Sequence, residues 1–412
     1  MQNYDIIVIG GGASGMMSAG RASELGKRVL ILEKNKRLGE KLRITGGGRS
    51  NVTNGEKDIK KFLSIYGKNE KFLHSIFSEF NAQDTFDFFK KMGLPLVIQA
   101  RQRAFPHTEK AEDVYKVMEK YITNKNVTIQ TSSPVTKINF ENNTITSVCC
   151  GSKTYTANSY ILATGSLSHP ETGSTGDGFK WLKDLGHSVA NPTPSIVPLK
   201  TEEKWSKSLS GTSLSFMKIT FYLEGKKSFS KTGKVLFTHF GLSGPLILNS
   251  ATAVADLLLN GIVTAKIDMY PDTDLGQLDQ KIIGFFDDNK NKLFKNILKE
   301  IVPEGMSKGI LILISDKIDI NKKVHSITKD ERKYLVNIFK ALPLTISGLM
   351  GFDRAVIADG GVPLNEINMR TMQSSKLNNL FITGDLLHIN RPSGGFSLQL
   401  CWTTGYVAGN NA

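Results

Sequence analysis

The stretch YDIIVIGGGASGMMSAGRASELGKRVLILEK, residues 4–34, decides the fold. An apolar run of β-forming residues leads into a glycine cluster, and a helical pattern and a second β-forming run follow. Gly10, Gly12 and Gly15 have the G-x-G-x-x-G spacing, and Glu33 ends the second run about 20 residues later. This order predicts a Rossmann-type βαβ unit that binds a dinucleotide. The alternative of a structural βαβ unit without a ligand stays open at this point.

The residues of this turn suit a diphosphate. Gly10 permits a tight turn from strand to helix, the missing Cβ of Gly12 lets a diphosphate approach the backbone, and Gly15 lets the helix pack against the strand. Ala13 and Ser14 open the helix, where unpaired N–H groups and the positive end of the helix dipole attract phosphate. We therefore expect all five residues at the cofactor.

Two charged residues follow the second strand. Glu33 stands where a carboxylate accepts a hydrogen bond from the adenosine ribose, and Lys34 comes next, so we expect both at the cofactor. The negative charge at position 33 disfavours a ribose 2′-phosphate, and therefore NADP, at this site.

Composition excludes several classes of protein. The 412 residues are 40% hydrophobic and 22% charged, which is ordinary for a globular chain of two or three domains. The three cysteines form no C-x-x-C and no zinc-ligand spacing, so neither dithiol chemistry nor a metal site is expected. No apolar run is long enough to span a membrane, and no signal-type segment opens the chain. We therefore expect a cytoplasmic protein with no membrane partner; the oligomeric state stays open.

The charge balance is basic. Lys and Arg number 52 against 38 Asp and Glu, which gives a net charge of +14. A basic protein attracts polyanions without specificity. The lysines are scattered rather than gathered in a long run, which favours a solvated surface and makes nucleic acid an unlikely partner.

Periodicity divides the chain. Helical spacing marks 70–92, as one helix or a pair, and 110–125, whereas alternation over 127–163 predicts short strands. Prolines mark a boundary near 190. Residues 196–270 are strand-like again, with a hairpin at ITFYLEG–KKSFS. Residues 274–342 are lysine-rich and mostly helical, apart from the ILILI run at 310–314, and nucleotide-binding features resume after about 343. No second G-x-G-x-x-G follows a strand, so no separate nicotinamide domain is visible.

Residues 39–54, GEKLRITGGGRSNVTN, form a glycine-rich loop dense in hydrogen-bond donors. Both a diphosphate and the polar edge of a flavin need donors on a backbone that can come close. The loop offers three glycines and several donors, among them Lys41, Arg49 and Asn51. A generic glycine loop is the alternative.

Residues 161–179, ILATGSLSHPETGSTGDGF, form a strand that ends in Ala163, Thr164 and Gly165, which suits a turn beneath a dinucleotide. Ser168 and His169 follow as candidate polar groups beside the ring. His169 precedes a proline, which biases it toward extended geometry. A proton donor and a loop histidine bonded to backbone are both open readings of His169.

The segment FTHFGLSGPLIL, residues 237–248, places His239 close to Ser243. A hydrolase would need the nucleophile elbow G-x-S-x-G, which this segment lacks. We predict a structural turn that feeds a helix or strand.

Residues 380–409 carry a second, remote glycine patch. A strand ends in Gly384 and Asp385, whose carboxylate could accept a bond from a ribityl hydroxyl. About ten residues later Gly394, Gly395, Phe396 and Ser397 open a helix. Its positive end would suit the N1–O2 edge of a flavin, which becomes negative on reduction. A nicotinamide has no such acceptor edge, so the pattern favours FAD over NAD.

These motifs together resemble a known family. The fingerprint, KLRITGGGRSNVTN, ATGSLSHPETGSTGDGF, GLSGPLIL, RAVIADGGV at 354–362 and the GD…SGGFSLQ…G ending are similar to the aminoacetone-oxidase/BaiN-like family of FAD-binding flavoproteins, over essentially the whole chain. The resemblance implies an α/β fold in which a Rossmann-like FAD-binding domain lies in two pieces, 1–190 and 343–412. It also implies an inserted β-barrel-like domain at 191–273 and a small helical subdomain at 274–342. By motif match it implies that Lys41, Gly47 and Asn51 line FAD, and Arg49 becomes a candidate polar group near the reacting ring.

The chain departs from this family in two places. Asp385 stands where relatives commonly have Glu, so the carboxylate is one methylene shorter. HINRPSGGFS stands where relatives usually have an Asp-rich stretch and Gly-Gly-Tyr-Asn. His388, Arg391, Phe396 and Ser397 therefore change the wall beside the flavin, and His388 and Arg391 join the candidate polar groups.

The sequence thus predicts an FAD-dependent oxidoreductase that moves a hydride between the flavin and a small organic substrate. Amine oxidation and reduction of an activated C=C bond both remain open, and NADH or NADPH is a compatible diffusible donor. An FAD-dependent tRNA-modifying enzyme that uses the positive charge is one alternative, and a non-enzymatic flavin-binding redox module is another.

Overall fold

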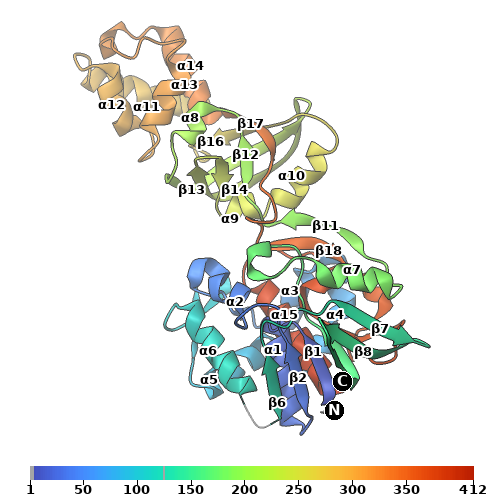
Figure 1. Ribbon diagram of the computed structural model, residues 1–412. Helices are drawn as coiled ribbons and strands as arrows, with labels where there is room; N and C mark the ends of the chain where they lie inside the picture. The colour runs from blue at the N-terminus through green and yellow to red at the C-terminus, as the bar shows by residue number, and fades with distance from the viewer. Residues whose placement is uncertain (1–3, 124–125) are drawn as a thin grey trace. The chain divides into compact units, whose positions relative to one another are not determined.

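The computed structural model describes residues 4–123 and 126–412. The chain forms two compact units (Figure 1). The first unit contains the residues up to Pro194 together with Ala355–Ala412, and the second unit contains Ser195–Arg354. The expected α/β fold with several sheets, a barrel and a helical subdomain is confirmed.

A seven-stranded sheet organises the first unit, in the order β19-β20-β21-β10-β1-β2-β6. Its five parallel strands are β1 (Tyr4–Ile9), β2 (Val29–Leu32), β6 (Val127–Gln130), β10 (Ala157–Leu162) and β21 (Leu380–Ile382). Two short antiparallel strands, β19 (Ile367–Asn368) and β20 (Gln373–Ser374), extend one edge. Because parallel strands end at the same edge of a sheet, the loops after β1, β10 and β21 meet there.

Strand β21 lies beside β10 although more than 200 residues separate them in sequence, so both pieces of the first unit build one sheet. The expected strands over 127–163 are confirmed. Between β6 and β10 lies an antiparallel meander of β7 (Lys137–Glu141), β8 (Thr144–Cys150) and β9 (Lys153–Tyr155).

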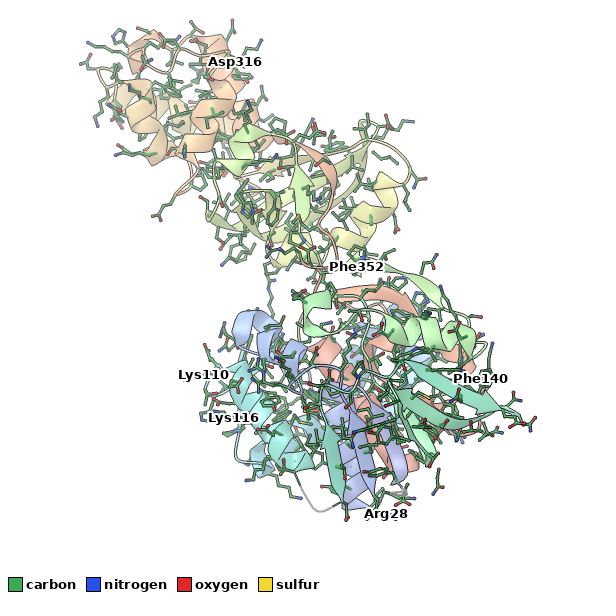
Figure 2. The ribbon with its side chains drawn as sticks, in the orientation of Figure 1. Arg28, Lys110, Lys116, Phe140, Asp316 and Phe352 are labelled. Carbon is green, nitrogen blue, oxygen red and sulfur yellow. The ribbon has the colours of Figure 1, made fainter. Side chains whose placement is uncertain are left out.

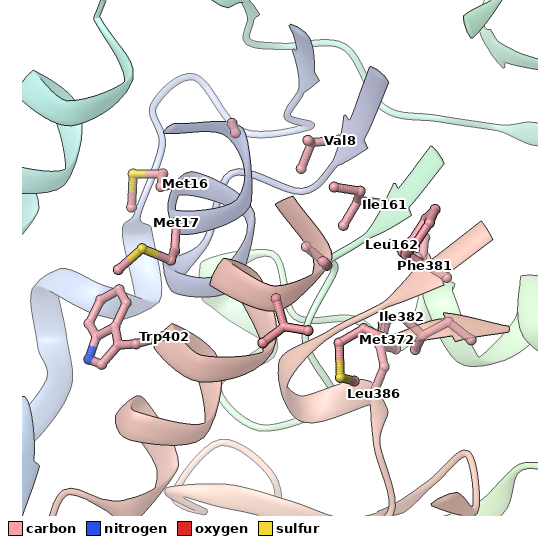
Figure 3. Close-up of a cluster of buried hydrophobic side chains, with 14 of the residues drawn as sticks. Val8, Met16, Met17, Ile161, Leu162, Met372, Phe381, Ile382, Leu386 and Trp402 are labelled. Atoms are coloured by element: carbon pink, nitrogen blue, oxygen red, sulfur yellow. The ribbon is translucent and has the colours of Figure 1, made fainter. Parts of the chain in front are cut away.

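Helix α1 (Ala13–Glu24) packs against α15 (Phe396–Asn411). A Cβ added to Gly405 would lie 2.5 Å from the backbone oxygen of Ser14, and one added to Gly409 would lie 2.4 Å from that of Ser18. The two glycines therefore allow a backbone approach that no larger residue permits. Figure 3 shows the core beneath this contact, in which side chains from both helices meet the sheet: Val8, Met16, Met17, Ile161, Leu162, Phe381, Ile382 and Trp402.

The remaining helices of the first unit follow the sequence pattern. The 70–92 stretch is a pair, α4 (Glu70–Glu79) and α5 (Ala82–Lys91), and the 110–125 stretch contains α6 (Ala111–Ile122). The other elements are α2 (Glu40–Ile44), α3 (Ile59–Ser64), α7 (Asp177–Asp184), the sheet β3-β5-β4 (Thr53–Asn54, Arg103–Pro106, Leu96–Gln99) and the pair β11-β18 (Ala190–Ser195, Ile357–Gly361).

A buried histidine follows α7. The Nδ1 atom of His187 lies 2.8 Å from Glu366 Oε2, and its Nε2 atom lies 2.8 Å from Ser374 Oγ. Ser374 Oγ already accepts the N–H groups of Lys376 and Leu377, so its own proton goes to Nε2 and the Nδ1 proton goes to Glu366. The arrangement resembles a hydrolytic triad, but the serine oxygen is committed to backbone. It ties two segments of the first unit together.

The second unit contains a closed barrel of β12-β15-β14-β13-β16-β17. Its strands are β12 (Leu199–Thr201), β13 (Ser213–Leu223), β14 (Lys226–Thr238), β15 (Gly241–Ser243), β16 (Val263–Asp268) and β17 (Leu342–Leu349). The expected hairpin is β13–β14, and the segment FTHFGLSGPLIL is the predicted turn, which feeds β15 and α9 (Pro245–Leu248). Helices α8 (Lys204–Lys207) and α10 (Ala251–Leu258) complete the region.

Two expectations for this unit are wrong. The ILILI run lies in helix α13 (Ser307–Ile314), because burial of Ile310 and Ile314 at helical spacing outweighs the β preference of branched residues. The boundary at 343 falls inside β17, which pairs with β12 and β16, so the chain leaves the second unit only after Arg354. The other helices of this subdomain are α11 (Leu275–Asp288), α12 (Phe294–Ile301) and α14 (Lys329–Lys340).

The surface agrees with a dispersed charge. Arg28 of the first unit is exposed far from Lys110 and Lys116, which are exposed at the start and in the middle of α6, and Phe140 projects from the β7–β8 hairpin (Figure 2). Within 4–123 and 126–412, none of the helices combines the length and the apolar character that crossing a bilayer requires.

Candidate functional site

The predicted cofactor residues gather where three neighbouring strands end. Gly10 follows β1, Ala163 follows β10 and Gly384 follows β21, and these strands are adjacent in the sheet. Gly384 N donates to Thr404 Oγ1 of α15 at 3.0 Å. A Cβ on Gly384 would lie 2.9 Å from Ser14 Oγ, so the turn after β21 touches the first turn of α1. The two distant glycine patches are therefore neighbours.

The first turn has the geometry that its glycines predict. Gly10 has φ +104°, and a Cβ there would lie 2.6 Å from Ala163 O. A Cβ on Gly15 would lie 1.9 Å from Gly10 O, so only glycine permits this approach of α1 to β1. A Cβ on Gly12, by contrast, would meet nothing within 4 Å. Gly12 thus borders open space at the start of α1, where Ala13 and Ser14 begin the helix.

No side chain caps α1 at Gly12. The N–H groups of a first helical turn have no partner within the helix, so this end is free to hold an anion. The turn after β10 also contains a glycine in the left-handed region, because Gly165 has φ +71°. Thr164 Oγ1 contacts the backbone oxygen of Gly165 at 3.4 Å.

Glu33 lies at the end of β2 and is buried. Its Oε2 accepts the N–H of Gly11 at 2.8 Å, and its Oε1 accepts the N–H of Asn35 at 2.9 Å. Burial raises the pKa of this carboxyl, although the two N–H groups oppose the rise. Lys34 Nζ forms an ion pair with Asp177 Oδ2 at 2.7 Å and also donates to Thr175 Oγ1. Through its bond to the N–H of Gly11, Glu33 helps to hold the glycine turn in its conformation.

The glycine-rich loop is tied to the start of α15. With its amide oriented to satisfy both of its sides, Asn51 accepts the N–H of Gly395 at 2.9 Å. Asn54 Nδ2 donates to Gly394 O at 3.0 Å, and Tyr66 donates its hydroxyl to Phe396 O at 3.0 Å. These bonds fix the direction in which the helix start points.

In the glycine-rich loop and at the start of α15, the backbone takes left-handed conformations that favour glycine. Gly395 has φ +97°, and a Cβ there would lie 2.2 Å from Thr53 O. Gly46 and Gly47 take left-handed angles, and a Cβ on Gly47 would meet nothing within 4 Å. Gly47 is thus a second place, besides Gly12, where the backbone borders open space.

A buried charged network joins four segments. Lys41 Nζ contacts Ser168 Oγ and lies 3.4 Å from Asp385 Oδ2. Arg391, which is 3% exposed, pairs through Nη2 with Asp385 and donates from Nε to Ser397 Oγ at 3.2 Å. Two cations thus face one carboxylate, and the cluster keeps a net positive charge.

The same cations set the protonation of their neighbours. Burial alone would raise the pKa of Asp385, but Arg391 and Lys41 outweigh it and hold this pKa below its usual range. Asp385 is therefore ionised. Burial, assisted by the charge of Asp385, raises the pKa of Cys401 to about 12, so this thiol stays protonated and is no nucleophile.

These residues fit a flavin dinucleotide. Gly12 and Gly47 leave room for a ligand against the backbone, and the starts of α1 and α15 carry no side-chain cap. Ser166, in the loop after β10, is fully buried with no hydrogen-bond partner for Oγ among the described residues. An unpaired buried hydroxyl costs free energy unless a ligand satisfies it. Bound FAD would supply hydride chemistry at its ring.

The remaining candidates lie in different surroundings. Arg49 stacks on Phe105 and pairs with Glu109 at 2.7 Å. His169 pairs with Glu171 at 2.8 Å, and its φ of +54° is left-handed rather than the expected extended form. The 3-10 turn that Pro170 opens explains the difference, because Thr172 N and Oγ1 both bond to His169 O.

His388 faces Asp359, which sequence reasoning did not select. Asp359 lies within RAVIADGGV, so the motif was noticed but the residue was not. An acidic residue directly after four apolar residues, 355–358, is the signal that could have found it. Both residues belong to the first unit.

The sequence matches the HI0933-like protein Rossmann domain family over residues 4–411. It is 27% identical to a 3-dehydro-bile acid delta(4,6)-reductase of Clostridium scindens, with 98% of each chain covered. It is also 27% identical to a ribosomal RNA dihydrouridine synthase of Haemophilus influenzae, again with 98% of each covered. Among solved structures, it is similar to the 3-ketosteroid-delta4-(5alpha)-dehydrogenase of Rhodococcus jostii RHA1, with TM-score 0.53, 12% identity and 99% and 96% of the two chains covered.

Fold and site together define a Rossmann-type flavoprotein. The chain belongs to the HI0933-like Rossmann family of FAD-binding flavoproteins, which confirms the resemblance found in the sequence. It is an FAD-dependent oxidoreductase, so the alternative of a non-enzymatic redox module is not retained.

Proposed function

We propose that this enzyme reduces a carbon–carbon double bond that is conjugated to a carbonyl group. The observation that carries the proposal is the full-length likeness to a bile acid delta(4,6)-reductase. The ribosomal RNA dihydrouridine synthase is also named for a product whose base has lost a double bond. Of the two reactions left open by the sequence, both names favour C=C reduction over amine oxidation.

The site supports this chemistry through charge. The cluster of Lys41, Arg391 and Asp385 keeps a net positive charge, and Arg391 also bonds to Ser397 in the first turn of α15. A positive environment stabilises the negative charge that a flavin ring gains on reduction. The cofactor-binding assignment of the sequence-predicted residues forms part of this proposal.

The first substrate class is a small conjugated ketone, with NADH or NADPH as the diffusible electron donor. The test is anaerobic reduction of the FAD-loaded protein by NADH, NADPH and a panel of amines, followed spectrally. We expect a nicotinamide to bleach the flavin and an enone to restore its colour. Bleaching by an amine, with no response to enones, would refute the proposal in favour of an amine oxidase.

A uracil ring in RNA is the second candidate substrate. Its support is the full-length likeness to a ribosomal RNA dihydrouridine synthase, together with the net charge of +14. In the barrel, Lys227 pairs with Tyr222 across β13 and β14, and Lys266 Nζ lies over the Tyr222 ring, 5.1 Å from its centroid. Lysines next to an aromatic ring are suited to binding single-stranded nucleic acid.

Re-oxidation of the reduced enzyme separates the two candidates. An unmodified ribosomal RNA transcript and a 4-ene-3-ketosteroid are offered in parallel at moderate salt. Colour returning only with the transcript, and dihydrouridine appearing in it, would replace the small-molecule proposal by the RNA one.

A further inference from the structure

His388 and Asp359 face each other within the first unit. His388 Nε2 lies 3.7 Å from Asp359 Oδ1. Asp359 belongs to β18, and the segment after β21 runs alongside the end of that strand. Val362 N donates to Leu386 O and His388 N donates to Val362 O, both at 2.8 Å. The backbone thus sets the distance between the two side chains.

The two partners differ in their access to solvent. The Asp359 side chain is 17% exposed and that of His388 is 32% exposed. In the described part of the chain, Oδ1 of Asp359 is buried without a hydrogen-bond partner. A buried carboxylate oxygen without a partner is costly, and the facing imidazole is the group that can satisfy it. A partly exposed imidazole paired with a carboxylate suits proton transfer to a ligand.

Other charges near His388 are already paired. On its own segment, Asp385 and Arg391 bind each other, and Lys41 approaches Asp385 from another loop. Asn69 Nδ2 donates to the backbone oxygen of His388 at 3.4 Å and carries no charge. Asp359 is therefore the charged group that contacts the imidazole. Because it faces Nε2, the other ring nitrogen, Nδ1, is the one left for a substrate.

We propose that His388 is the acid that protonates the substrate carbon during C=C reduction and that Asp359 is the residue that positions it. The inference rests on the proposed function. The new C–H bond at the β-carbon would take its hydride from bound FAD that a nicotinamide had reduced. The π electron pair moves onto the carbonyl-conjugated α-carbon, which takes the proton from Nδ1 of His388. The neutral ring then regains a proton from water.

The pairing can be tested without turnover. Protein labelled with ¹³C at histidine Cε1 is observed by NMR at one fixed pH, and His388→Asn identifies the His388 signal among the seven histidines. Asp359→Asn should shift the His388 signal, because the change replaces the carboxylate 3.7 Å from Nε2 by a neutral amide. Asp353→Asn, an exposed change of equal charge, is the control and should leave the signal in place. An unmoved His388 signal in Asp359→Asn would overturn the pairing.

The catalytic role needs separated half-reactions. With cyclohexenone or a 4-ene-3-ketosteroid, His388→Asn should slow re-oxidation of the reduced enzyme by about 100- to 10,000-fold. Flavin reduction by the nicotinamide should be unchanged. Asp359→Asn should also slow re-oxidation without slowing flavin reduction, and Asp359→Glu should restore part of the rate.

The outcomes are distinguishable. Full re-oxidation activity in His388→Asn would refute the acid role while leaving C=C reduction intact. A wild-type enzyme that reduces no conjugated substrate would refute the proposed function and the role of His388 with it, even if the NMR coupling were present. Equal slowing of both half-reactions would show a structural effect and would also count against the proposal.

Discussion

Replacement of Gly405 by alanine tests whether the two ends of the first unit must approach closely. The new Cβ would lie 2.5 Å from the backbone oxygen of Ser14, whereas ordinary contact begins at about 3.4 Å. Backbone on both sides cannot yield locally, so α1 and α15 must separate by roughly 1 Å. Overpacking of this kind costs about 1–3 kcal/mol, and the better helix propensity of alanine returns about 1 kcal/mol. We expect a net loss of up to about 2 kcal/mol.

Gly284 provides a matched control. It also lies inside a helix, α11, but a Cβ there would meet nothing within 4 Å. Gly284→Ala should therefore gain up to about 1 kcal/mol from propensity alone. The measurement is the free energy of unfolding in urea, followed by circular dichroism and by the fluorescence of buried Trp402.

The same substitution should weaken the cofactor site. Separation of the helices moves the start of α1 away from the turn after β21, so FAD affinity should fall about 3- to 10-fold, equivalent to about 1 kcal/mol. A Gly405→Ala protein that gains stability as Gly284→Ala does, and binds FAD as tightly as wild type, would refute the reasoning.

Three further predictions follow from single contacts. Gly12→Val should lower FAD affinity by about 100-fold while hardly changing the thermal midpoint, because its side chain enters open space; equal affinity in a titration would contradict the site. Asp385→Asn should cost about 3 kcal/mol in urea, since Arg391 stays buried without its anion; an unchanged midpoint would show that the pair is dispensable. Burial lowers the pKa of His187 in the folded protein despite its bond to Glu366. As the pH falls below about 6.5, the unfolded chain therefore binds a proton at this histidine that the folded protein does not bind. Stability should therefore fall as pH drops from about 6.5, and this slope should shrink in His187→Gln; unfolding curves between pH 5 and 8 measure both.

Local signals explain what the sequence predicts well. The β1–α1–β2 unit is contiguous, and the steric demand at Gly15 comes from Gly10 O, five residues earlier, so spacing alone defines the unit. The helix start at Gly395 and the strand ending at Gly384 are equally local. That these patches meet depends on strand pairing across the whole chain, which the family resemblance implied and the sheet order shows.

Contacts between distant residues explain what the sequence hides. The pairing of Asp359 with His388 arises because β18 lies beside the segment after β21, and no spacing encodes this. The close approach at Gly405 depends on the oxygen of Ser14, at the other end of the chain. Ile310 and Ile314 belong to a helix because neighbouring helices bury them together, against their own β preference.

The split of the sheet has a consequence for synthesis. Strands β1, β2 and β10 leave the ribosome before the second unit, and their neighbour β21 leaves only after it. The second unit is continuous in sequence and has its own core, so it can fold before β21 has been synthesised. During that time the edge of β10 that pairs with β21 stays unpaired. Capture of the cofactor is therefore a late event in the life of a nascent chain, and the interval before it is when the unfinished sheet is most vulnerable to aggregation.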